Sequence, residues 1–214
     1  MNILHPELLS AVEAGRPVDI RVWRHGVVSV PLLNEEYCRY LISKAEQMNV
    51  WDAVHDEWER QTASQKGKEV GVGTLDEAER FVEPFEQHFM PAVKAYYKLE
   101  VTKILEPFIS RYTIGGITAM KRHKDRRGLV SGVIRLNDEF EGCRFRFPDL
   151  DFDAGVVALG PILMFPKYYD HEVTELTAGK RYSLAIWISG EPLPEASTAG
   201  AAGATLVDRG APFG

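Results

Sequence analysis

Cysteine is scarce in this sequence, and the usual signals of export and membrane insertion are missing. The two cysteines, Cys38 and Cys143, stand far apart and do not make a disulfide framework. No apolar run approaches the length of a membrane span, and the first residues lack the basic stretch and apolar run of a secretory signal. We therefore expect a cytoplasmic protein with no membrane partner.

Basic residues are also fewer than acidic residues. The chain of 214 residues carries 25 Lys and Arg against 31 Asp and Glu, which gives a formal charge of −6. This balance disfavours a nucleic-acid partner. The sequence contains no Gly-rich phosphate loop, serine elbow or Cys-rich zinc pattern. These absences exclude several common enzyme classes and leave an ordinary globular domain.

The first 100 residues are predicted to be mainly helical. Helical spacing of apolar residues predicts three helices, Pro6 to about Ala14, Leu33–Met48 with Asn34 as N-cap, and Leu75 to about Lys98 with Thr74 as N-cap. A short strand is expected at Val18–Trp23. The polar stretch Trp51–Gly73 lacks periodicity, so we interpret it as a loop or lid, or alternatively as a disordered insertion.

From Thr102 to Ile188 the chain changes to short β-rich runs separated by turns. These runs are Ile104–Tyr112, Val130–Asn137, Arg144–Phe147, Pro161–Phe165 and Tyr182–Trp187. Helices followed by many strands predict an α+β, mainly β fold in which helices pack on a double-sheet β structure. We expect one domain over 1–189, with helical support at 1–100 and the β core at 101–189. The Ala-, Gly- and Pro-rich residues 190–214 are expected to form a flexible tail.

Three residues have the chemistry of a metal site. His123 and Asp125 are two residues apart, so on an extended segment they lie on one face and can reach one cation. A lone pair of this kind is more often a surface pair than a metal site. His171, near a later strand, can complete a set of two imidazoles and one carboxylate. That set leaves coordination positions open and is typical of non-haem iron(II) oxygenases.

Downstream residues strengthen this interpretation. Arg181 opens a strongly β-type run, and a guanidinium fixed inside a barrel can bind a carboxylate through two hydrogen bonds. Ser183 lies on the same strand face and can add a hydroxyl donor. Lys180 is the competing carboxylate partner. A metal triad with a carboxylate-binding arginine is what a chelating 2-oxo diacid requires.

The segment from Tyr112 to Trp187 resembles the prolyl 4-hydroxylase-like branch of the 2-oxoglutarate/Fe(II)-dependent oxygenases. The resemblance is carried, in the family's order, by RYTIGGITAMKRHKD, VIRLNDEFEGCRFRFP, GPILMFP, DHEV and GKRYSLAIW. It implies a double-stranded β-helix, or jelly roll, with supporting N-terminal helices. It also implies that His123, Asp125 and His171 bind Fe(II), that Arg181 binds the far carboxylate of 2-oxoglutarate, and that Tyr112 contacts this cosubstrate. Oxygen is the further cosubstrate, and ascorbate is a candidate addition.

Two positions depart from the family pattern. Arg135 stands where the family often has a cosubstrate-binding tyrosine, so Arg135 either replaces it, binds substrate or forms an internal ion pair. In the run Arg144–Phe147, arginines alternate with phenylalanines, so one pair faces the interior and the other faces away. We favour buried phenylalanines and solvated arginines. The alternative places Arg144 at the mouth of the site, where it binds an anionic substrate.

The resemblance implies a dioxygenase that hydroxylates an unactivated C–H bond and releases succinate and carbon dioxide. The substrate is either a peptidyl residue such as proline, or a free amino acid or small metabolite. One alternative is a catalytically silent jelly-roll binding module. Another is a metal-dependent jelly-roll enzyme that does not use 2-oxoglutarate, in which loss of Arg181 would leave the activity intact. The sequence leaves the substrate and the oligomeric state open.

Overall fold

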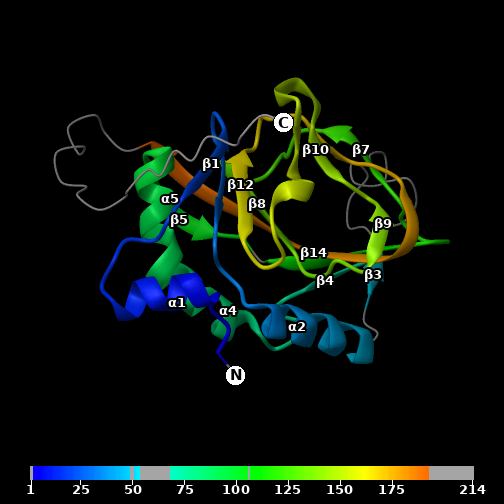
Figure 1. Ribbon diagram of the computed structural model, residues 1–214, viewed down its shortest axis with the longest axis horizontal. Helices are drawn as coiled ribbons and strands as arrows, with labels where there is room; N and C mark the ends of the chain where they lie inside the picture. Colours follow the sequence, from blue (N-terminus) through cyan, green and yellow to red (C-terminus); the bar gives the residue numbers. More distant parts are fainter. Residues whose placement is uncertain (1, 49–50, 54–67, 106, 193–214) are drawn as a thin grey trace.

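Two antiparallel sheets face each other and form a jelly roll with helices packed on one outer side (Figure 1). The computed structural model describes residues 2–48, 51–53, 68–105 and 107–192. The main sheet has ten strands. Eight of them follow the order β1-β2-β12-β8-β14-β6-β4-β3, while β5 and β9 each pair with β14. The smaller sheet has the order β11-β10-β13-β7. The mainly β jelly roll expected from the sequence is therefore confirmed.

The strands of the main sheet come from both halves of the chain. They are β1 (Arg21–Arg24), β2 (Val27–Val30), β3 (Asp52–Ala53), β4 (Lys68–Gly71), β5 (Leu99–Ile104), β6 (Phe108–Thr113), β8 (Val130–Arg135), β9 (Phe140–Gly142), β12 (Ile162–Pro166) and β14 (Leu176–Pro192). The long strand β14 pairs with β5, β6, β8 and β9, so it organises the centre of the sheet.

The smaller sheet carries the two histidines of the predicted metal site, His123 and His171. Its strands are β7 (Met120–His123), β10 (Phe145–Phe147), β11 (Phe152–Asp153) and β13 (His171–Val173). Two short 3-10 turns, η2 (Pro148–Leu150) and η3 (Ala154–Val156), flank β11. The space between the two sheets is the interior of the jelly roll.

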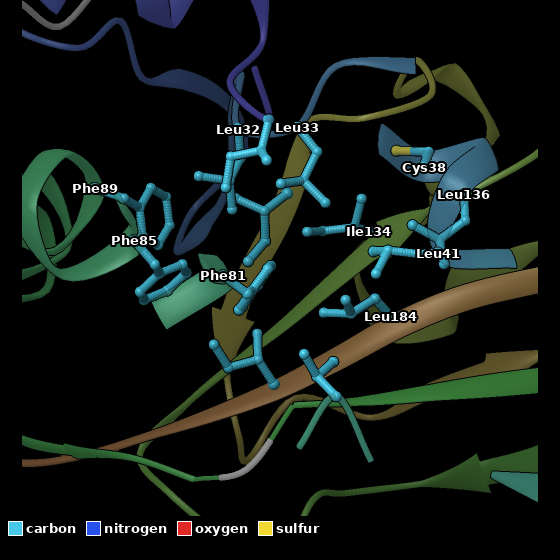
Figure 2. Close-up of a cluster of buried hydrophobic side chains, with 14 of the residues drawn as sticks. Leu32, Leu33, Cys38, Leu41, Phe81, Phe85, Phe89, Ile134, Leu136 and Leu184 are labelled. Carbon is cyan, nitrogen blue, oxygen red and sulfur yellow. The ribbon is translucent and has the colours of Figure 1, made fainter. Parts of the chain in front are cut away.

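The helices cover the outer face of the main sheet. They are α1 (Pro6–Glu13), α2 (Glu35–Met48), α4 (Ala78–Pro84), the π-helical turn η1 (Phe85–Phe89) and α5 (Met90–Tyr97). Figure 2 shows how Leu41 of α2 and Phe81 of α4 approach Ile134 and Leu184 of the sheet. All four side chains are fully or almost fully buried. This apolar layer between helices and sheet is the largest hydrophobic core cluster.

The N-cap of α2 is where the sequence places it, because Asn34 Oδ1 accepts a hydrogen bond from the Tyr37 amide at 2.7 Å. The next helix was wrongly predicted to start at Leu75 after a Thr74 cap. Asp76 has a φ of 55°, which a right-handed helix does not allow, so the helix begins at Ala78.

The same helix contains a π-turn. The Met90 amide bonds to the Phe85 carbonyl, which is the wider spacing of a π-turn. Pro91 follows and has no amide hydrogen to donate to the preceding turn. The predicted helix from Leu75 to Lys98 is therefore present from residue 78 to 97, as α4, η1 and α5 in direct succession, with a π-turn in its middle.

Strands also occur where none were expected. The predicted strand at Val18–Trp23 is β1, shifted to Arg21–Arg24, and it pairs with the unpredicted β2 in a hairpin. Residues 1–100 are therefore not helical support alone, since β1 to β4 join the main sheet. Both ends of the predicted loop Trp51–Gly73 form the strand pair β3 and β4, and residues 54–67 lie outside the described part of the chain.

The predicted run Ile104–Tyr112 is two strands, β5 and β6, because Pro107 cannot donate a ladder hydrogen bond. At the other end of the domain, β14 runs on to Pro192 and pairs with β5 there. This strand takes in the first three residues of the predicted tail, and residues 193–214 lie outside the described residues. No helix in the described ranges has the length and apolar character of a membrane span.

Candidate functional site

Two histidines and an aspartate meet where β7 ends and β13 begins, in the smaller sheet. His123 ends β7 and His171 begins β13, and the two residues are direct partners across the strand pair. Asp125 follows just after β7. Its Oδ1 atom lies 3.9 Å from His123 Nε2 and 3.8 Å from His171 Nε2. The potential ligand atoms of the three residues all lie within 4.8 Å of one another. The structure therefore brings together the three residues that the sequence singles out.

The hydrogen bonds of both imidazoles leave the same nitrogen available. His123 Nδ1 lies 2.7 Å from the Lys121 carbonyl, and His171 Nδ1 lies 3.0 Å from the Tyr169 carbonyl. A carbonyl oxygen only accepts, so each Nδ1 carries the proton and each Nε2 presents its lone pair to the shared space. Burial lowers the pKa of His171, which favours the neutral ring that a metal needs.

Aromatic rings enclose His171, and the sequence argument did not identify them as part of the site. Phe145 stacks on the His171 ring at 5.3 Å between centroids, and Phe165 meets it edge-on at 4.8 Å. Phe147 lies behind them in the same small core cluster. The alternation in Arg144–Phe147 was the available signal, since it points both phenylalanines inward. These rings fix the imidazole and keep water away from one side of it.

Arg144 is largely solvated, as the favoured interpretation expects. Its side chain is 63% exposed, and its Nε atom lies 2.6 Å from Asp153 Oδ2. Arg146 is also exposed. Arg144 borders a second hollow that Arg135 and Arg181 also line, but its charge is already paired.

Arg181 is the most unusual charged residue of the interior. Its side chain is buried, it donates a hydrogen bond to Ser183 Oγ at 3.1 Å, and its guanidinium lies 5.1 Å from the centre of the Tyr112 ring. Among the residues that the structure describes, no aspartate or glutamate forms an ion pair with Arg181. A buried cation without an anion is costly, so this geometry calls for an anionic ligand.

Arg181, Ser183 and Tyr112 line the same cavity as the two histidines and Asp125. Burial raises the pKa of Tyr112, and the neighbouring guanidinium of Arg181 opposes that rise, so the phenol stays protonated at neutral pH. Lys180, the competing candidate, is exposed and adjacent to Arg181 on the strand, so its side chain faces away from the cavity.

Arg135 reaches the same region from the neighbouring strand. It is the direct partner of Ser183 across β8 and β14, and it lines the second hollow together with Arg181. Its Nε atom lies 3.0 Å from Asp138 Oδ1. The internal ion pair, one of the three roles considered for Arg135, is therefore present. The pairing leaves the guanidinium beside the cavity wall that Arg181 shares.

Cys143 and Trp187 are the other side chains of note around the interior. Cys143 is a free, buried thiol, as is Cys38, so the described chain has no disulfide between them. Burial raises the pKa of Cys143 to about 11, which leaves it a neutral thiol. Trp187 lines the cavity next to Phe108, with 4.9 Å between ring centroids. Among the β14 residues that line the cavity, Trp187 lies furthest along the strand from Arg181.

Sequence comparison alone places this chain in no group, because no protein-family model and no curated protein matches it. Solved structures do match its fold. A prolyl hydroxylase from Trichoplax adhaerens, in complex with a hypoxia inducible factor peptide, superposes with a TM-score of 0.60 at 14% identity. That match covers 86% of this chain and 87% of the other.

Two further structures support the same fold. A Pseudomonas putida prolyl-4-hydroxylase matches with a TM-score of 0.57 and 18% identity, over 85% of this chain and 98% of that one. The viral collagen prolyl hydroxylase of Paramecium Bursaria Chlorella virus-1, in its 2OG complex, matches at 0.55 and 15%, over 73% and 91% of the two chains. The chain therefore has the jelly-roll fold of the prolyl hydroxylases, with a two-histidine, one-aspartate cluster inside it.

Proposed function

We propose that the protein is an Fe(II)- and 2-oxoglutarate-dependent dioxygenase that hydroxylates an unactivated C–H bond. The observation that carries this proposal is the buried Arg181 guanidinium, which lacks a described carboxylate partner and faces the cavity of His123, Asp125 and His171. A metal site alone fits many chemistries. A metal site that shares a cavity with an unpaired arginine fits a chelating cosubstrate with a distal carboxylate.

The three-residue cluster fits iron(II). Two neutral imidazoles and one carboxylate on one side of an ion are the ligand set of non-haem iron oxygenases, and they leave positions for cosubstrate and oxygen. With iron bound, oxygen and 2-oxoglutarate yield succinate, carbon dioxide and an oxidant for the substrate. The carbonyls of Lys121 and Tyr169 hold the two rings in the ligating orientation.

The polar residues of the inner face would hold the cosubstrate. Arg181 would bind its distal carboxylate through the guanidinium fork, with the Ser183 hydroxyl beside it. The Tyr112 ring would hold the Arg181 guanidinium in place through a cation–π contact. Arg135 would add positive charge from β8, in the place where the resembling family often has a tyrosine. Arg181 lines the metal cavity itself, whereas Arg135 lines the adjoining hollow and is paired with Asp138, so Arg181 is the residue proposed to bind the distal carboxylate.

A peptide is the favoured substrate class. The matched Trichoplax adhaerens prolyl hydroxylase is in complex with a hypoxia inducible factor peptide, which supports a peptide substrate for this chain. A prolyl residue is the first candidate, by analogy with the matched prolyl hydroxylases. A free amino acid or small metabolite is the alternative.

The proposal is tested by reconstituting the protein with iron(II) and 2-oxoglutarate in air and measuring succinate and carbon dioxide. We expect both products in equal amounts, with no product when either iron or 2-oxoglutarate is left out. A protein that binds iron but makes no succinate under any tested condition would be the silent module. Substrate oxidation without succinate would instead indicate a metal enzyme that does not use 2-oxoglutarate.

A further inference from the structure

Positive charge is concentrated around the first two candidate ligands. The segment Lys121–Arg127 has the sequence KRHKDRR, so five of its seven residues are basic in a chain whose net charge is −6. All five basic residues are exposed, whereas His123 and Asp125 between them are mostly covered. We call Lys121, Arg122, Lys124, Arg126 and Arg127 the basic rim, because these exposed residues flank His123 and Asp125, which line the cavity.

The backbone holds the second half of this rim in a fixed place. The Asp125 amide donates to the Lys167 carbonyl at 3.0 Å, and the Lys167 amide donates to the Leu129 carbonyl at 3.0 Å. The Leu129 amide donates to the Ile188 carbonyl of β14 at 2.7 Å. Gly128 has a φ of 65°, and a Cβ there would lie 2.8 Å from the same carbonyl. The basic residues of this second half, Arg126 and Arg127, therefore lie on a loop that backbone hydrogen bonds attach to the main sheet.

Part of the rim's charge is neutralised within the chain. Arg122 bonds to Asp149 and to Asp170, and Lys124 lies 4.0 Å from Asp170. Arg127 differs, since within the described part of the chain no carboxylate forms an ion pair with it. Arg127 is exposed, so its positive charge faces solvent.

Arg127 also connects the rim to the cavity. Its guanidinium lies 5.6 Å from the centre of the Trp187 ring, and the other neighbour of that ring is Phe108. Trp187 and Phe108 both line the cavity that holds His123 and Asp125. A chain that enters the cavity past Trp187 therefore passes Arg127. An exposed guanidinium in this position can form an ion pair with a negatively charged side chain next to the reacting residue.

We propose that the basic rim binds acidic side chains that flank the oxidised residue of a peptide substrate. This inference rests on the proposed oxygenase function and names the substrate class of the same site. The rim spreads along seven residues outside the cavity, which suits an extended chain with several carboxylates better than one small anion. The overall negative charge of the protein opposes nucleic acid as the occupant.

The test compares two fluorescein-labelled peptides that each carry a central proline and differ only in flanking Glu against flanking Gln. Binding is measured by fluorescence anisotropy, with 2-oxoglutarate present and Mn(II) in place of iron to prevent turnover. We expect the Glu peptide to bind about five- to tenfold more tightly at low salt. Raising the salt concentration should remove most of that difference, because exposed charges are screened.

Three variants locate the effect. Arg127→Gln should reduce the preference for the Glu peptide, and Arg127→Lys should retain most of it because the charge remains. The matched control is Arg39→Gln, which removes one exposed, ion-paired arginine from α2, on the helix-covered side of the main sheet. This control should leave the preference unchanged, although it alters the net charge by the same amount.

Equal binding of the two peptides, or no binding of either, would overturn the inference. Tighter binding of a single-stranded oligonucleotide than of the Glu peptide would also overturn it. Each preparation is checked for the visible charge-transfer band of iron with 2-oxoglutarate. Loss of peptide preference with the band present contradicts the acidic-substrate inference alone, whereas absence of the band in folded wild-type protein contradicts the oxygenase function.

Discussion

The two faces of the main sheet are built from the same strands and have opposite character. On β14 and β8, Leu184, Ile186 and Ile134 point outward into the apolar layer beneath the helices. The residues between them, such as Ser183 and Arg135, point inward to the cavity. Side chains alternate along a strand, so one strand can serve both faces without compromise. A shift of one residue in register would exchange the two sets.

The comparison shows where stability and chemistry reside. The outer face buries large apolar side chains and gives the fold most of its free energy of unfolding. The inner face places a buried arginine and two histidines in a cavity, which costs stability unless ligands bind there. We therefore expect substitutions on the two faces to separate cleanly into losses of binding and losses of stability.

The largest effect should come from the inner face. His123→Ala removes one of the candidate ligands, so we expect iron binding and succinate formation to fall below detection. The free energy of unfolding of the metal-free protein should change little, because the ring lies at the edge of the cavity. Iron content after reconstitution and a denaturant titration measure the two quantities. Normal iron content in this variant would show that the metal lies elsewhere.

The second effect also belongs to the inner face. Arg181→Ala should weaken 2-oxoglutarate binding by about 2–5 kcal/mol, the range for a buried charge pair that loses one partner. Iron binding should persist, since the three ligands are intact. Succinate formation against 2-oxoglutarate concentration measures the change as a raised KM. Wild-type turnover at low cosubstrate would contradict the role of Arg181.

A matched truncation on the outer face should give the opposite outcome. Leu184→Ala removes a fully buried side chain next to Ser183 and should lower the free energy of unfolding by about 2–5 kcal/mol. At temperatures where the variant is folded, its affinity for iron and 2-oxoglutarate should match the wild type. The free energy of unfolding and the two affinities are measured on the same preparation, so that differences between preparations do not enter the comparison. A large change in cosubstrate affinity would mean that the two faces are coupled.

The smallest effect concerns a polar link on the outer face. Glu46 of α2 accepts hydrogen bonds from Arg111 and from the Tyr182 hydroxyl. Burial raises the pKa of Glu46, but these hydrogen bonds outweigh it and the pKa lies below its ordinary value. A lowered pKa means that the stabilisation is full above the ordinary value, near pH 4.5, and is lost as the pH falls through the lowered one.

Glu46→Gln should therefore cost about 1–2 kcal/mol at neutral pH. Wild type and variant should converge in stability as the pH drops below the ordinary glutamate range. Denaturant titrations over a pH series measure this difference. A gap that stays constant with pH would show that the carboxylate charge does not contribute.

The pair His123 and Asp125 and the inward pair Arg181 and Ser183 of β14 were predictable because each pair depends only on local spacing. His123 and Asp125 share a face two residues apart, and Arg181 and Ser183 do the same, so the alternation of a strand is sufficient. The alternation in Arg144–Phe147 also predicted the solvated arginines. His171 was a candidate third ligand from its residue type and its place near a later strand, but its pairing with His123 depends on sheet order, which a single sequence does not fix.

Other features depend on contacts that sequence patterns do not contain. The predicted helix from Leu75 to Lys98 shows an unbroken apolar stripe, yet the positive φ of Asp76 delays its start to Ala78 and a π-turn lies in its middle. The strands β2, β3 and β4 gain their partners from distant segments. Three roles were considered for Arg135, and only the three-dimensional structure shows that it forms an ion pair with Asp138.

The most direct test of the central claim is an anaerobic titration of the metal-free protein with iron(II) and then 2-oxoglutarate, followed by visible absorption. Chelation of iron by the cosubstrate in this ligand set should produce a weak charge-transfer band. The band should need far more cosubstrate in Arg181→Ala and should be missing in His123→Ala. Absence of the band in well-folded wild-type protein would contradict the assignment of His123, Asp125, His171 and Arg181 to one iron and 2-oxoglutarate site.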